Sequence, residues 1–119
     1  MTREEKQLLI KDLCERLPYG IKVWYPNGSG VISIVKGIVG DVCYFNEEPR
    51  YDNRCPIESV KPYLRPMSSM TRDDYAIVQQ LVKKQWGGDT DWLNAHHFDY
   101  RGLIEKGLAI EVTEENNPY

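Results

Sequence analysis

The sequence contains few cysteines and no closely spaced pair of them. Cys14, Cys43 and Cys55 form an odd, scattered set without a CxxC motif. Such a set argues against a disulfide framework and suits a reducing compartment. The chain also lacks an apolar run near the ~20 residues that span a bilayer, and its start, MTREEKQLLIKDL, lacks the apolar core of a secretory signal. We therefore predict a cytoplasmic protein with no membrane partner.

Charge of one sign is not in large excess either. Lys and Arg total 15, and Asp and Glu total 18, which gives a formal net charge of −3. This balance provides no general attraction to nucleic acid or to an anionic membrane. Hydrophobic residues make up 41% and charged residues 28% of the chain, which is typical of a globular domain and not of a disordered one.

Motifs for metal binding are also missing. His96 and His97 are adjacent, and neighbouring side chains point ~100° apart on a helix or to opposite faces of a strand. The HExxH spacing of helical zinc sites is absent. We interpret one histidine as packing beside Trp92 and the other as capping a turn or facing solvent. The two remain weak metal candidates, and no cofactor is predicted.

A nucleophilic cysteine needs a thiolate near a base. Cys43 falls in the middle of a predicted strand, and Cys14 is explained as a small buried residue on a helix stripe. Only Cys55, in a loop before a proline, is expected to be exposed. No motif surrounds it, and the glycines of PNGSG do not form the phosphate-binding GxxxxGK[ST] pattern. We therefore expect that the protein is not an enzyme.

The first half of the chain changes periodicity from helix to strand. Thr2 and Glu5 have capping-box spacing and begin a helix that ends near Pro18. The segments IKVWY, VISIV and VCYF then predict three strands, with Gly37 as a bulge and Gly40-Asp41 as a turn. IESVKPYLRP predicts a short turn and an extended edge segment, because proline cannot donate to a ladder.

The second half predicts helices and a closing strand. Thr71 is the expected N-cap of a helix with an apolar face, and Asp91 and Asp99 are expected to cap two shorter helices, the second ending at Gly107. LAIEV predicts a last strand. The whole is a single α+β domain over residues 1–112: an N-terminal helix, a small bent antiparallel sheet of SH3-like character, C-terminal helices and the closing strand. Residues 113–119 are expected to form a flexible acidic tail.

Aromatic residues on the predicted strands are the main binding candidates. Alternation sends some of them outward, where they can grip a peptide or stack bases beside nearby cations. Aromatic residues in a small sheet also serve as core, and these cations are interleaved with acids, so both interpretations stay open. The candidate binding residues are Trp24, Tyr25, Tyr44, Phe45, Arg50, Arg54, Lys61 and Arg65.

Three segments carry a resemblance: CERLPYGIKV (14–23), ESVKPYLRPMSSMT (58–71) and DWLNAHHFDYRGLIEKGLAI (91–110). Together they resemble a family of small uncharacterised proteins of Bacteroides-type gut bacteria, their prophages and other mobile elements. The resemblance covers nearly the whole chain, although the end after Ile110 departs from an EAPEGMY-like tail. It implies an intracellular accessory protein of phage or mobile-element origin, and it transfers no site residue.

These observations favour a non-catalytic protein-binding or regulatory accessory protein with an unknown protein partner. The alternative is a nucleic-acid-binding small barrel that uses the sheet aromatics and the nearby Arg and Lys residues. A metal- or cysteine-dependent enzyme that uses His96, His97 or Cys55 is the second alternative. The sequence leaves the oligomeric state open.

Overall fold

The computed structural model describes residues 1–25, 31–45, 54–83 and 88–119. The fold is α+β and begins with helix α1 (Arg3–Arg16). The predicted capping box is present, because the Thr2 hydroxyl accepts a hydrogen bond from the Glu5 N–H at 3.1 Å and the Glu5 carboxylate accepts one from the Thr2 N–H at 3.0 Å. A short 3-10 turn, η1 (Leu17–Tyr19), ends the helix at Gly20, whose φ is 69°.

The inner face of α1 differs in part from the predicted stripe. Leu9 and Leu13 are fully buried, as the spacing indicates. Cys14 is exposed, so its prediction as a buried residue is wrong. The reason is that Asp12 and Arg16, both 0% exposed, occupy the inner face beside Leu9 and Leu13 and leave Cys14 on the far side of the helix.

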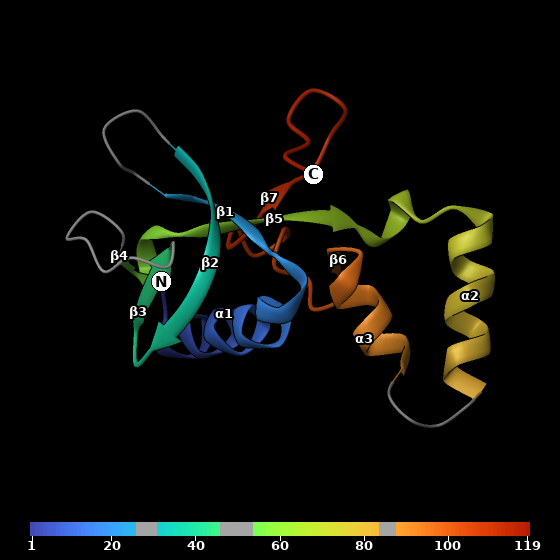
Figure 1. The fold of residues 1–119 in the computed structure, drawn as a ribbon, viewed down its shortest axis with the longest axis horizontal. Helices are drawn as coiled ribbons and strands as arrows, with labels where there is room; N and C mark the ends of the chain where they lie inside the picture. Colours follow the sequence, from blue (N-terminus) through green and yellow to red (C-terminus); the bar gives the residue numbers. More distant parts are fainter. Residues whose placement is uncertain (26–30, 46–53, 84–87) are drawn as a thin grey trace.

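Four antiparallel strands follow α1 and curve over it (Figure 1). The register between the second and third strands shifts between Val35 and Gly37, which confirms the predicted bulge. Gly40, with a φ of 60°, forms the tight turn that follows. The strands are β1 (Lys22–Tyr25), β2 (Val31–Val39), β3 (Val42–Phe45) and β4 (Arg54–Pro56).

Strand β5 (Lys61–Pro66) is central, so its prediction as an edge strand is wrong. It follows the 3-10 turn η3 (Ile57–Ser59) and pairs antiparallel with β1 and then parallel with β7 (Ile110–Glu111) and β6 (Phe98–Asp99). The sheet is therefore mixed and not purely antiparallel. Each paired residue of β5 pairs with only one of these three strands. A proline in β5 therefore does not have to take part in ladders on both sides, which explains how this central strand accommodates two prolines.

Two helices lie beyond the end of β5 (Figure 1). After the 3-10 turn η4 (Met67–Ser69), Thr71 caps α2 (Arg72–Lys83) as predicted: its hydroxyl accepts a hydrogen bond from the Asp74 N–H at 3.1 Å. Helix α3 (Gly88–Ala95) begins three residues before Asp91, the predicted cap. Because Asp91 lies inside the helix, its prediction as the N-cap is wrong.

The segment after β6 is held by Asp99. Its carboxylate accepts hydrogen bonds from the N–H groups of Leu103 and Ile104, both at 2.9 Å, but no helix follows it in the described residues up to 119, so its prediction as a helix N-cap is wrong. The chain then forms consecutive turns in place of the predicted helix. Gly107, with a φ of 73°, has the expected left-handed conformation.

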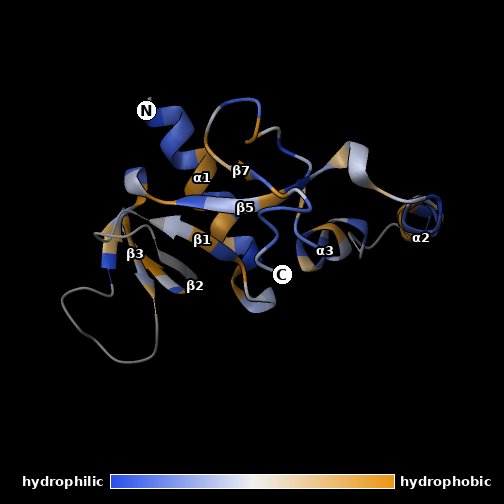
Figure 2. Cartoon of the chain, turned by 90° about the horizontal axis from the view of Figure 1, so that it is seen from above, coloured by the Kyte–Doolittle hydropathy of each residue, from blue (hydrophilic) through white to orange (hydrophobic). Residues whose placement is uncertain are grey.

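The core lies between α1 and the sheet, and Figure 2 shows apolar residues gathered where α1, β1 and β5 meet. Leu103 and Leu108 close one end of it from the last segment. None of the helices in the described part of the chain is both long and apolar enough to cross a membrane. The largest apolar side chains that are fully buried are Phe45, Phe98, Leu9, Leu13, Ile21, Ile57, Leu64 and Leu103.

The last residue of the predicted flexible acidic tail contacts the sheet. The Tyr119 hydroxyl accepts a hydrogen bond from the Lys22 N–H at 3.1 Å and donates one to the Tyr63 carbonyl at 2.8 Å. It therefore bridges β1 and β5 just beyond their last paired residues. The Tyr119 ring stacks on His97 with 3.7 Å between the ring centroids. These contacts hold residue 119 against the sheet.

Candidate binding surfaces

The two adjacent histidines point to different partners and do not converge. His96 stacks on Trp92 at a ring-centroid distance of 4.0 Å, and its Nδ1 lies 2.9 Å from the Trp92 carbonyl oxygen. This confirms the prediction that one histidine packs beside Trp92. His97 has a φ of 63° and turns its ring toward Tyr119. The described residues contain no group of three or more His, Cys, Asp or Glu side chains placed to hold a metal ion.

The environment of His97 suits stacking better than proton transfer. Burial, together with the charge of Arg16, lowers the pKa of His97 to about 4. The imidazole is therefore neutral near pH 7, and it is a weak base compared with a general base tuned to that pH. Its Nδ1 is buried and has no hydrogen-bond partner among the described residues.

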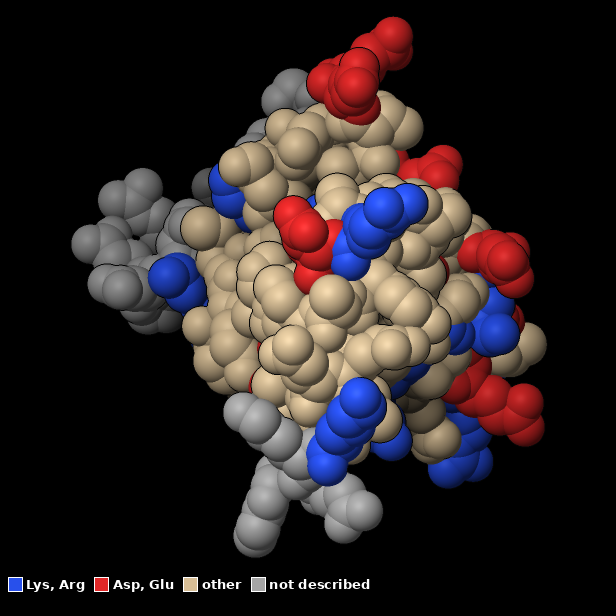
Figure 3. Space-filling model, turned by 90° about the vertical axis from the view of Figure 1, so that its right-hand side faces the viewer, with Lys and Arg blue, Asp and Glu red and all other residues tan. Residues whose placement is uncertain are grey.

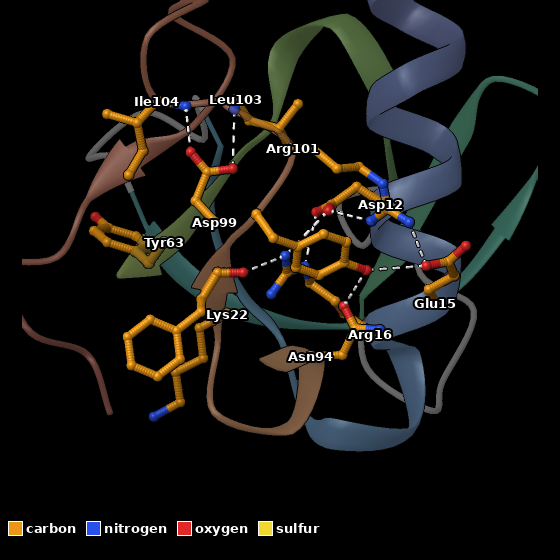
Figure 4. Close-up of polar contacts among 12 residues, drawn as sticks. Asp12, Glu15, Arg16, Lys22, Tyr63, Asn94, Asp99, Arg101, Leu103 and Ile104 are labelled. Atoms are coloured by element: carbon orange, nitrogen blue, oxygen red, sulfur yellow. Dashed lines mark hydrogen bonds and ion pairs between the residues drawn. The ribbon is translucent and has the colours of Figure 1, made fainter. Parts of the chain in front are cut away.

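An ionic network that the sequence analysis missed lies beside this segment (Figure 4). Asp12 and Arg16 are fully buried and form a bidentate pair, with Nε to Oδ2 at 2.9 Å and Nη2 to Oδ1 at 3.1 Å. Arg101 donates from Nη1 to the same Asp12 carboxylate at 2.6 Å. Arg16 also donates to the Phe98 carbonyl at 2.6 Å. The network thereby joins α1 to the last segment of the chain.

The second carboxylate of the network is also occupied. Glu15 pairs with Nη2 of Arg101, and the hydrogen bond from Arg101 holds the pKa of Glu15 below its usual value. The Tyr100 hydroxyl lies 2.9 Å from Asn94 Oδ1 and 3.1 Å from Glu15 Oε2. Because arginines neutralise both carboxylates, neither is placed as a free acid or base, and we assign the network a structural role.

The cysteines differ from their predicted positions. Cys55 is 8% exposed and lies in β4, so the expectation of an exposed loop thiol is wrong. The cause is strand alternation, which turns Cys55 inward between the exposed Arg54 and Pro56. Cys43 is fully buried directly opposite Cys55 on β3. Burial raises the pKa of the Cys43 thiol to about 12.

Two predicted aromatic residues share the outer face of the sheet, which we call the sheet surface. Trp24 is opposite Lys61 across the β1–β5 pair, and Tyr44 is opposite Arg54 across the β3–β4 pair. Both aromatic side chains are half-buried and alternate with core residues. The sheet surface is defined by Trp24, Tyr44, Ile34, Arg54 and Lys61.

Other predicted binding residues lie elsewhere. Phe45 is 1% exposed and belongs to the core, so it is not available to a ligand. Arg65 is on β5, and its guanidinium lies 4.2 Å from the ring centroid of Phe98 on β6. It therefore stacks on Phe98 and not on Trp24 or Tyr44. Arg50 and the side chain of Tyr25 are outside the residues that the structure describes.

Helix α2 carries a second exposed apolar surface. No residue of this helix is buried, although Tyr75, Val78 and Val82 lie along one stripe at three- and four-residue spacing. Tyr75 is 58% exposed and Val82 is 54% exposed. Leu81 faces α3, with its Cδ2 close to Gly88. We call the residues Arg72, Tyr75, Val78, Val82 and Lys83 the α2 surface.

The space-filling view of this end of the molecule shows a continuous uncharged area bordered by charged side chains (Figure 3).

Comparisons with protein-family models, curated proteins and solved structures find no match for this chain. The family resemblance and the SH3-like character therefore stay predictions, and the two surfaces are the features from which a function can be argued.

Proposed function

We propose that this chain is a non-catalytic accessory protein that binds another protein through the α2 surface. The observation that carries the proposal is an amphipathic helix whose apolar stripe remains open, with Tyr75 and Val82 each more than half exposed. Contiguous exposed apolar side chains mark interaction sites, and an amphipathic helix is a common element of helix-to-helix recognition. Covering an exposed aromatic residue of this kind gives a large apolar contact.

The charges around the stripe favour a partner with acidic residues. At roughly 100° per residue, Arg72 and Lys83 lie on the same flank of the stripe. Both are exposed, and neither forms an ion pair among the described residues. Asp74, by contrast, already accepts a hydrogen bond from the Thr71 N–H at 3.0 Å. We infer that the occupant is an amphipathic helix whose apolar residues are flanked by Asp or Glu.

A second copy of the same helix fits less well. In an antiparallel pair related by a two-fold axis, each flank faces the same flank of the copy. Arg72 and Lys83 of one helix would then face Arg72 and Lys83 of the other. Like charges placed this close disfavour the pairing, so the charge pattern points to a different protein.

The test is selection of peptides from a random display library by the folded protein. We expect enriched peptides to carry apolar residues at helical spacing with flanking Asp or Glu. They should lose binding to the Tyr75→Ala/Val82→Ala variant and weaken at high salt, because exposed ion pairs are screened. The matched control is Gln80→Ala, an exposed position on the other side of α2.

Three outcomes would overturn this function. Enrichment of basic peptides, or of none, contradicts the acidic partner. Binding that survives the double alanine substitution places the contact elsewhere. Concentration-dependent self-association that the same substitution abolishes identifies a second copy as the occupant. Circular dichroism of each variant distinguishes lost binding from lost folding.

A nucleic-acid function is a second candidate because the sheet surface pairs aromatic residues with cations. Trp24 beside Lys61 and Tyr44 beside Arg54 supply a stacking group and a positive charge together. This function predicts salt-sensitive binding of a fluorescein-labelled single-stranded oligonucleotide that Trp24→Ala weakens. Unchanged fluorescence anisotropy at low salt would exclude it. A role as a phage or mobile-element accessory protein is compatible with either surface.

A further inference from the structure

Two buried thiols face each other across the edge of the sheet. Cys43 on β3 and Cys55 on β4 are directly opposite in the antiparallel register, so both side chains leave the strands on the same face. Both belong to the core, at 0% and 8% exposure. Among the described strands, β4 is an edge strand that pairs with β3.

The ladder fixes the geometry of this cysteine pair. The Ile57 N–H donates to the Asp41 carbonyl at 2.8 Å, which makes these opposed residues a hydrogen-bonded pair. Pairs alternate in kind along an antiparallel ladder, so Cys43 and Cys55, two positions along, are also a hydrogen-bonded pair. The Cα atoms of such a pair are about 5.5 Å apart, a separation that is common in disulfides.

The two thiols differ in access. A pocket of about 270 Å³ is lined by Cys55 together with Val42, Arg54 and Pro56. Cys43 is not among its lining residues and is 0% exposed. The raised pKa of Cys43 leaves little thiolate for a first attack. A small reagent therefore meets Cys55 first.

We propose that Cys55 and Cys43 are a thiol modification site that takes a low-molecular-weight disulfide and is oxidised reversibly to a cross-strand disulfide. The Cys55 thiolate attacks one sulfur of the reagent, forms a mixed disulfide and releases one thiol. Cys43 loses its proton to solvent, attacks the Cys55 sulfur and releases the second thiol. Two cysteine thiols are thus oxidised while the reagent is reduced to two thiols.

The register also explains why this disulfide would be easily reduced. Opposed Cβ atoms in a hydrogen-bonded pair are about 5.5 Å apart, whereas a disulfide needs about 3.5–4.5 Å. Closing the bond therefore requires β4 to move toward β3 and stores strain. An edge strand with one partner can make this shift, and strained disulfides have more oxidising potentials. The bond would therefore be labile and not a permanent crosslink.

The experiment incubates the folded Cys14→Ser protein with oxidised glutathione and follows it by intact mass and peptide mapping. We expect a loss of two hydrogen atoms, a peptide that links Cys43 to Cys55, and full reversal by reduced glutathione. The Cys43→Ser variant should stop at a glutathione adduct on Cys55. The Cys55→Ser variant should give no adduct on Cys43 while the protein remains folded.

Several results would overturn the inference. One is that both thiols stay free under conditions that modify Cys14 of the unsubstituted protein. Another is a disulfide that forms only in denaturant, since the folded register would then play no part. A third is a stable adduct on Cys55 with Cys43 intact beside it, because the second step would have failed. None of these outcomes bears on the α2 surface, which is tested separately.

Discussion

Replacing Asp12 by alanine should test the interior network most directly. The Asp12 carboxylate is 0% exposed and accepts hydrogen bonds from two arginines, Arg16 and Arg101. Its removal leaves the guanidinium of Arg16, also 0% exposed, with the Phe98 carbonyl as its hydrogen-bond acceptor. Arg101 is affected less, because it keeps its ion pair with Glu15.

The expected loss follows from the uncompensated charge. Breaking a buried ion pair by removing one partner costs about 3–5 kcal/mol, a large share of a net stability of about 5–15 kcal/mol. For a urea m-value of about 2 kcal/mol/M, a loss of about 4 kcal/mol lowers the unfolding midpoint by about 2 M. The Asp12→Ala protein should therefore unfold at a much lower urea concentration.

The assay is equilibrium urea unfolding followed by tryptophan fluorescence, with Asp41→Ala as the matched control. Asp41 pairs with Lys6 at 3.0 Å, but its side chain is 64% exposed. Exposed pairs of this kind contribute little to stability because water screens them, and Lys6 retains Glu58 at 2.7 Å. The two substitutions thus remove the same chemical group from a buried and an exposed site.

Equal losses in the two variants would refute the reasoning, because burial of the ion pair would then make no difference. A second arm separates charge from packing. Asp12→Leu combined with Arg16→Met removes both buried charges and keeps apolar volume, so it should recover much of the stability lost in Asp12→Ala. A double variant as unstable as the single one would show that the ions themselves are required.

Three further predictions concern the last segment of the chain. Tyr119→Phe removes a hydroxyl that bridges two backbone groups and should lower the free energy of unfolding by about 0.5–1.5 kcal/mol in urea. Asp99→Ala removes the acceptor of two backbone N–H groups and should lower it by about 1–3 kcal/mol in the same assay. The folded pKa of His97, about 4, lies below its unfolded value, so the unfolded chain binds the proton first and stability falls as pH drops from about 6.5 toward 4. The His97→Asn variant, which tolerates the left-handed backbone, should show a smaller fall between urea titrations at pH 7 and pH 4.5, and an identical fall would exclude His97 as its source.

Local signals in the sequence predicted the elements well where one residue determines the backbone. The capping box at Thr2, the cap at Thr71, the bulge at Gly37 and the left-handed Gly107 all depend on a few adjacent residues. Such features are independent of what packs against them, so they can be inferred from a short stretch of sequence.

Features that depend on distant strands were predicted less well. The prolines of β5 indicated an edge strand, but the chain brings β6 and β7 to it from more than thirty residues away. The same limit explains Cys55, because an inward direction requires a register with β3 that the loop-like sequence does not show. Strand pairing is a tertiary property, and local propensity is a weak guide to it.

The polar network was missed for a related reason. Asp12 and Arg16 have the i, i+4 spacing of an ordinary surface ion pair on a helix. Nothing local shows that Arg101 and the Phe98 carbonyl meet them. The spacing did contain a signal: Asp12 is three residues from Leu9 and Arg16 is three residues from Leu13, and residues three apart lie on the same face of a helix.

The distribution of polar contacts also separates the scaffold from the proposed binding element. Residues 14–23, 58–71 and 91–110 supply most partners of the internal network, including Arg16, Asn94 and Arg101. Helix α2 (Arg72–Lys83) lies outside all three segments and buries none of its residues. Substitutions at its exposed positions therefore cost the fold little. A surface that can vary without destabilising the domain is well suited to match a particular partner, which supports α2 as the site where binding specificity is set.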